Sequence, residues 1–111
     1  MRDAKTHLLS PTGRYCVAHE GIYALCLGTI YVHGMLPRER EGSRAMAIQL
    51  AFELMEMTVQ DLQRMLTANR HLEEMCERPS TAVTEQSVVD LVALGDRALS
   101  QARLIYPDSF F

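Results

Sequence analysis

Four residues near the N-terminus carry side chains that ligate transition metals: Cys16, His19, Cys26 and His33. Structural zinc sites are usually built from two close pairs of ligands, such as Cys-x2-Cys with His-x3-His. Only Cys16 and His19 form such a pair, because Cys26 and His33 are separated by six mostly apolar residues. On a helix these two side chains would lie two turns apart, too far to hold one ion from one side. We therefore expect no metal site.

A second group with reactive side chains lies further along the chain, where His71 and Cys76 flank the carboxylates Glu73 and Glu74. A Cys–His pair can act as nucleophile and base. However, the chain lacks a Gly-rich phosphate loop, a Ser elbow and a metalloprotease helix motif. On a helix, the carboxylates are typical of a solvated face. We therefore expect neither enzymatic activity nor a cofactor.

Residues 58–78 have the rhythm of a helix, a short turn and a second helix, which is typical of DNA-reading regulators. The supposed turn lacks glycine, and the supposed recognition helix carries Glu73, Glu74 and Glu77, which phosphate would repel. The whole chain has 11 basic and 14 acidic residues, so it offers no strong basic patch. A dimeric DNA-binding regulator is therefore the alternative function, and nucleic acid is not the expected partner.

Length and composition indicate one compact domain over residues 1–111, since 48% of the residues are apolar and 23% are charged. We expect a flexible N-terminus to about residue 13 and a C-terminal tail from about residue 106. Three cysteines and an N-terminus without an apolar signal segment favour the reducing cytoplasm over a disulfide framework.

The most apolar stretch, residues 21–36, is too short to span a membrane, because a spanning helix needs about 20 apolar residues. We predict instead a buried helix over roughly 17–35. Near its start, residues 14–19 are an alternative candidate for a short extended segment. Gly21, Ala24 and Gly28 recur at helical spacing, so they predict a stripe for close helix packing.

Residues 43–78 contain no glycine or proline and predict a long helix with a bend at 57–59 or at 67–69. Its first half has only a narrow polar stripe, so most of its circumference must be covered. A last helix is predicted over 85–105, with a second small-residue stripe at Gly95, Ala98 and Ala102.

These elements predict an all-α fold, a small antiparallel bundle of three to four helices. The wide apolar arc of residues 45–59 exceeds what short neighbours would cover, so we expect a homodimer. The residues expected at the partner or dimer interface are Met46, Phe52, Met55, Met57, Val59 and Met65. The function that follows is a non-enzymatic regulatory protein that binds another protein, such as an adaptor, a chaperone-like protein or an anti-host factor.

Overall fold

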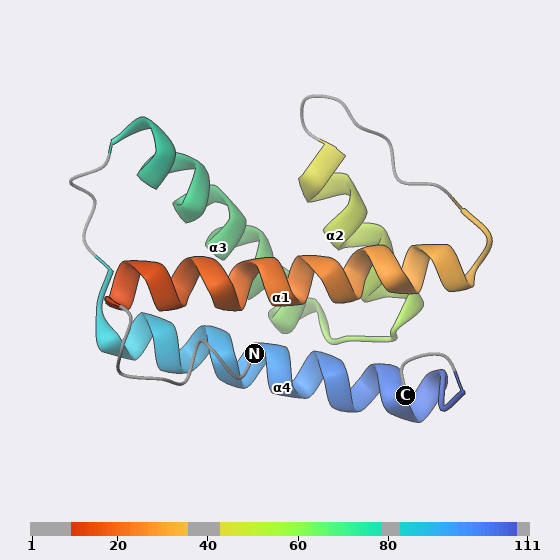
Figure 1. The fold of residues 1–111 in the computed structure, drawn as a ribbon. Helices are drawn as coiled ribbons and strands as arrows, with labels where there is room; N and C mark the ends of the chain where they lie inside the picture. The colour runs from red at the N-terminus through yellow and green to blue at the C-terminus, as the bar shows by residue number, and fades with distance from the viewer. Residues whose placement is uncertain (1–9, 36–42, 79–82, 109–111) are drawn as a thin grey trace.

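The computed structural model describes residues 10–35, 43–78 and 83–108, and within them the chain forms four helices and no strand. They are α1 (Pro11–Val32), α2 (Ser43–Leu54), α3 (Val59–Glu77) and α4 (Glu85–Ile105) (Figure 1). The prediction of a small all-α bundle is confirmed. None of these described helices combines the length and the apolar character that crossing a membrane requires.

Helix α1 begins earlier than the sequence pattern predicts. The Ser10 side chain accepts a hydrogen bond from the Gly13 backbone N–H at 3.1 Å, and Pro11 occupies the first turn. Both features favour a helix start, because the first turn has N–H groups without helical partners. The extended segment expected near residues 14–19 is therefore wrong, and residues 11–13 are helical. Residues 1–9 of the predicted flexible N-terminus lie outside the described residues.

A short connection divides the predicted long helix over 43–78 into α2 and α3. It lies at the first of the two expected bends, the one at residues 57–59. Glu56 adopts a left-handed backbone with φ of 59°, and Thr58 then caps α3 by accepting from the Asp61 N–H at 3.1 Å. The other expected bend, at residues 67–69, lies inside α3. Thr58 determines where α3 begins, because its side chain accepts a hydrogen bond from a first-turn N–H that has no partner within the helix.

Helix α4 has the predicted bounds, and Thr84 caps it by accepting from the Ser87 N–H at 3.0 Å. Tyr106 holds the start of the predicted C-terminal tail. Its hydroxyl donates to the Leu54 carbonyl at 3.1 Å and is hydrogen-bonded to His33 Nε2 at 2.5 Å, and its ring meets the His33 ring edge-on. Residues 109–111 of that tail lie outside the described residues.

Helices α1 and α4 lie side by side and run in the same direction (Figure 1). Arg14 pairs with Glu85 where both helices begin, and His33 contacts Tyr106 where both end. The antiparallel arrangement predicted from the sequence therefore does not hold for this pair. The reason is that α2 and α3 together return the chain to the start of α1 before α4 begins.

The two small-residue stripes differ in their placement. Gly95, Ala98 and Ala102 are buried on α4, whereas Ala24 is exposed and Gly21 and Gly28 are only half-buried on α1. Helix α1 turns a different face to the core, formed mainly by Tyr15, Ala18, His19, Ile22, Cys26, Thr29 and Ile30. The predicted α1 stripe is thus not the face that packs most deeply.

The middle of the apolar arc of residues 45–59 is covered within one chain, whereas Met46 and Val59 in the same arc are exposed. Ile48, Ala51 and Met55 are fully buried and Phe52 is 1% exposed. Helices α1 and α3 both pack against α2, so this arc forms part of the core. Its burial does not require a second subunit.

Candidate functional site

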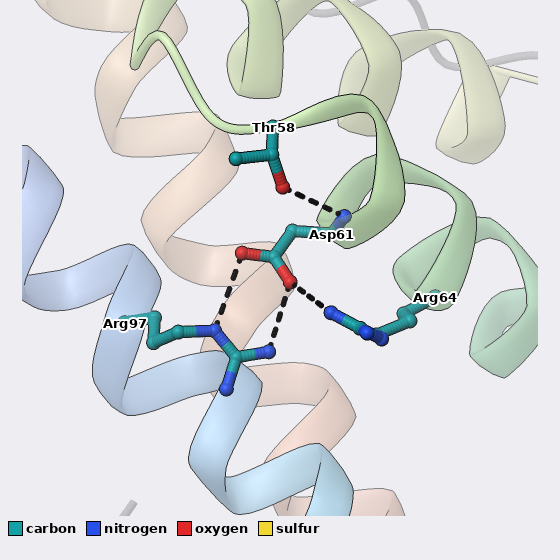
Figure 2. Close-up of polar contacts among 4 residues, drawn as sticks. All are labelled: Thr58, Asp61, Arg64 and Arg97. Atoms are coloured by element: carbon teal, nitrogen blue, oxygen red, sulfur yellow. Dashed lines mark hydrogen bonds and ion pairs between the residues drawn. The ribbon is translucent and has the colours of Figure 1, made fainter.

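Asp61, in the first turn of α3, is the centre of a charged network that joins α3 to α4. Arg97 of α4 donates from Nε to Oδ2 at 3.2 Å and from Nη2 to Oδ1 at 2.9 Å, while Arg64 donates from Nη1 to Oδ1 at 2.7 Å (Figure 2). The Asp61 side chain is 8% exposed, whereas both guanidinium groups reach solvent. The cap at Thr58 sets this position, because it fixes the turn that presents Asp61 towards α4.

Arg97 and Arg64 keep Asp61 ionised in its buried position. The hydrogen bond from Arg97 is the largest cause that lowers the pKa of Asp61, and Arg64 adds to it against the opposing effect of burial. In turn, Asp61 raises the pKa of Arg97. A buried carboxylate with two cationic donors is a stable ion pair, and it is also a fixed charge at a surface hollow.

On one side of this ion pair, α3 and α4 diverge and leave a hollow of about 560 Å³. Tyr15 of α1 lies at its base beside the apolar side chains Ala68, Leu91 and Leu94. The remaining lining is more polar and consists of Arg64, Thr67, His71, Ser87, Asp90, Ala93 and Arg97. An apolar base with a polar rim is typical of a surface that binds an amphipathic partner.

On the other side of the ion pair lies a second hollow of about 540 Å³. Its lining comes from the α2–α3 connection and from the second half of α4: Glu56, Met57, Thr58, Asp61, Asp96, Arg97, Ser100, Gln101 and Leu104. Leu104 is 76% exposed, more than any other large apolar side chain in the described ranges. An exposed leucine beside a hollow can anchor a partner.

The two hollows follow one another along α4 from Ser87 to Leu104, one on each side of the Asp61–Arg97 pair, and Arg97 lines both. We call this surface the α4 groove, with an N-terminal half towards Ser87 and a C-terminal half towards Leu104. At 1.5 Å per residue, it extends about 25 Å along the helix. That length matches four to five turns of a partner helix.

Helices α1 and α3 carry several buried polar side-chain atoms without a hydrogen-bond partner among the described residues. The buried side-chain atoms that lack a hydrogen-bond partner in the described part of the chain are Arg14 Nε, His19 Nδ1 and Nε2, Asn69 Oδ1 and His71 Nε2. All belong to α1 or α3. Burial lowers the pKa of His19, while Glu20 acts in the opposite direction. Buried polar atoms without partners cost free energy.

The structure separates the six residues predicted for a partner interface into two groups. Phe52, Met55 and Met65 are buried in the core of one chain. Met46 and Val59 are exposed, at 59% and 68%, and Met57 is half-buried in the C-terminal half of the α4 groove. Only the second group can touch a partner without rearrangement.

The metal and thiol candidates do not converge. Among residues 10–35, 43–78 and 83–108, no cluster of three or more His, Cys, Asp or Glu side chains has a geometry suited to a metal ion. The three cysteines are free, and burial raises the pKa of Cys26 to about 12. The His71 ring packs against the Tyr15 ring with centroids 5.4 Å apart and a tilt of 45° between the ring planes. Cys76 is exposed near the C-terminal end of α3, the helix that also carries His71.

The segment considered for DNA reading forms one uninterrupted helix from Val59 to Glu77, with the acidic side chains Glu73, Glu74 and Glu77 exposed. Of its basic residues, Arg64 is committed to Asp61. The turn that a helix-turn-helix reader requires is absent from this stretch.

The α4 groove was not predicted from the sequence, although part of it has a local signal. Thr58 followed three residues later by Asp61 resembles a capping box, which predicts a helix start at this point. Nothing in the order of residues indicates that Arg97 meets Asp61, since 36 positions separate them.

The chain matches no protein-family model, and the comparisons with curated proteins and with solved structures also gave no match.

Proposed function

We propose that this protein acts without catalysis, by binding another polypeptide chain along the α4 groove. The observation that carries the proposal is the succession of two hollows along α4 from Ser87 to Leu104, with Arg97 common to both. A regulator, an adaptor or a chaperone-like protein would use such a surface.

The lining of the groove favours a helix as the bound element. Amphipathic helices dock by placing an apolar stripe on an apolar groove, with anchors at spacings of three and four residues. Leu91 and Leu94 form the base of the N-terminal half, and Met57 and Leu104 supply apolar surface in the C-terminal half. The rim carries both signs of charge, which can fix the direction of the partner.

Two features support the proposal that the protein acts without catalysis. The acidic group at the centre, Asp61, already has Arg64 and Arg97 as donors, so it is poorly suited to accept a proton from a substrate. Cys26, as a buried thiol with a raised pKa, is poorly suited to act as a nucleophile.

The cytoplasm remains the proposed compartment. Three free cysteines, one of them exposed at Cys76, are consistent with a reducing environment. The alternative of a DNA-binding regulator has weaker support, because the exposed end of α3 is acidic.

Site-specific photo-crosslinking in cells tests the proposal. A photoreactive amino acid is placed at Thr67 or Ser100, which are exposed and line the two halves of the groove. Control variants carry it at Gln49 or Val89, which are exposed but do not line the groove. The proposal predicts defined crosslinked products from the groove positions and little product from the controls. Equal products from all four positions, or none from the groove, would contradict it.

A further inference from the structure

We infer that the contact between α1 and the second half of α3, residues 68–77, is an acid-sensitive switch that a proton on His19 opens. The first turn of α3 stays on α4, and α1 stays on α2 and α4. This switch is separate from the proposed function, because it acts within one chain and is the same whatever partner the groove binds.

His19 of α1 is a fully buried ionisable group in this contact. Its side chain is 0% exposed, and neither ring nitrogen has a hydrogen-bond partner among the described residues. Asn69 is the α3 side chain that acts on the ring, and its own Oδ1 also lacks a partner there. The neutral ring fits this site, whereas the protonated ring would place a charge in the core, and a buried charge needs a counter-ion.

The carboxylates around the His19 ring already have other donors. Glu20 Oε1 lies 3.9 Å from Nδ1 of the ring, but the same oxygen accepts from Arg44 of α2 at 2.6 Å. Glu73 of α3 accepts from Asn69 at 3.4 Å. Burial is the largest cause that lowers the pKa of His19, and the charge of Arg44 adds to it, while Glu20 and Asn69 offset only part of this effect. Protonation therefore favours a state in which water reaches the ring.

The other ionisable groups nearby do not compensate such a charge. The ring of His71 on α3 packs against Tyr15 of α1, and a histidine can only gain positive charge in acid. Arg14 of α1 is 5% exposed, and its carboxylate partner is Glu85 of α4. Acid thus adds positive charge to a part of α1 that already carries a buried arginine.

Among the neighbours of α1, α3 is the one whose contact gives way most readily. Helix α4 is joined to α1 where both begin and again where both end, and α2 is joined to it by the pair of Arg44 and Glu20. The contact with α3 is the least extensive that α1 makes, and within the described ranges no ion pair joins these two helices.

The first turn of α3 is fixed separately, because Asp61 is bonded to Arg97 of α4. Beyond residue 67, the buried residues of α3 are Ala68, Asn69 and Met75. Met75 is thus the one large apolar side chain that is buried in this half of the helix. The second half can therefore separate from α1 while the core around α2 stays closed.

Hydrogen–deuterium exchange of the full chain at pH 7.5 and pH 5.0, read by mass spectrometry, tests the switch. Protection factors, corrected for the intrinsic effect of pH, are compared between residues 68–77 and the other helices. A short helix without tertiary contacts is marginal in water, so its amides exchange once it separates. The closed state binds fewer protons than the open state, whose histidine has a pKa of about 6.5, so acid favours opening. Protection of residues 68–77 should fall about ten-fold more than that of α1, α2 and α4.

The wild type alone can overturn the inference. An equal loss of protection in all helices would mean that acid unfolds the whole chain, and unchanged protection at residues 68–77 would mean that the contact stays closed. Both results contradict the switch.

Variants assign the proton to one ring. His19→Leu should keep residues 68–77 protected at pH 5.0. His33→Gln is the matched control, since His33 is an exposed histidine at the end of α1, and it should leave the response unchanged. A response that survives His19→Leu, or that His71→Gln abolishes in its place, would overturn the role of His19.

Discussion

Asp61 of α3 and Arg97 of α4 are joined by two hydrogen bonds, from Nε and Nη2 of the arginine to the two carboxylate oxygens. This bidentate pair links the first turn of α3 to α4 (Figure 2). It lies between the two halves of the α4 groove, since one half is lined by α3 and the other by the α2–α3 connection. The position of α3 against α4 should therefore depend on it.

Arg97→Met should lower the free energy of unfolding by about 1–3 kcal/mol, because it removes two donors from a buried carboxylate. Arg64→Met is the matched control, since Arg64 gives the same carboxylate one bond from a more exposed side chain, and its cost should be about 0–1 kcal/mol. Urea denaturation measures both. A larger loss for Arg64→Met would show that the interhelical bond contributes less than the bond within α3.

Stability should fall in acid through Asp61. Its pKa in the folded protein lies below the unfolded value of about 3.9, so the folded state binds fewer protons. The stabilisation is complete above that unfolded pKa and is lost as the pH falls through the folded pKa. Asp61→Asn should therefore be less stable than wild type at pH 6, with the difference shrinking below pH 4. Melting temperatures across pH 2.5–6 measure this, and parallel profiles would contradict it.

His19 should produce a separate pH dependence nearer neutrality. Its pKa in the folded state is lowered by burial, so the unfolded state, with a pKa of about 6.5, binds more protons. Its contribution is fully present above about pH 6.5 and declines as the pH falls towards the folded pKa. His19→Leu should flatten the stability profile between pH 5 and 6.5. At pH 7.5 it should cost little, because both ring nitrogens lack hydrogen-bond partners within the described residues.

The three thiols should react with Ellman's reagent in a fixed order. Cys76 is exposed and should react first, followed by Cys16, which is half-buried and whose pKa is raised mainly by burial. Cys26 is fully buried and should react only when the protein unfolds. Stopped-flow absorbance with single-cysteine variants assigns each phase. A fast phase from Cys26 would show that the core opens on the same timescale.

The α2–α3 connection can be tested at Glu56, where the backbone is left-handed. Glu56→Gly should stabilise the protein by about 0.5–1 kcal/mol, because glycine adopts a φ of 59° without a side-chain clash. Gln49→Gly, at an exposed position in the middle of α2, should instead cost about 1 kcal/mol. Thermal denaturation of the two variants compares them directly. Destabilisation by both would mean that the Glu56 side chain contributes more than its backbone conformation costs.

The helical elements were predictable because their signals are local. The bounds of the last helix follow from Thr84 and from the apolar spacing that ends at Ile105. For the long central segment, the sequence predicted a bend but left two positions open. The residues around Thr58 and those at 67–69 are both weak helix formers, so they give similar signals. The capping hydrogen bond to Asp61 decided between them.

The arrangement of the elements was less predictable, because it depends on contacts between distant residues. The partly exposed α1 stripe and the buried α4 stripe are both rows of small residues at helical spacing, so spacing alone does not identify the packed face. Likewise, the burial of Phe52 and Met55 depends on how α1 and α3 lie across α2. The candidate site was missed for the same reason, since Asp61 and Arg97 become neighbours only in the folded chain.

The parallel course of α1 and α4 has a consequence for how the protein folds. Arg14 and Glu85 are 71 positions apart, and His33 and Tyr106 are 73 apart. Forming such contacts closes a long loop, and the entropic cost of closure precedes the stabilisation from packing. Folding is therefore slower than for a bundle of sequential hairpins. During synthesis, α1 cannot acquire its principal neighbour until residues near Ile105 have left the ribosome. Chains truncated before α4 should therefore lack cooperative unfolding, whatever helix content α1 to α3 retain.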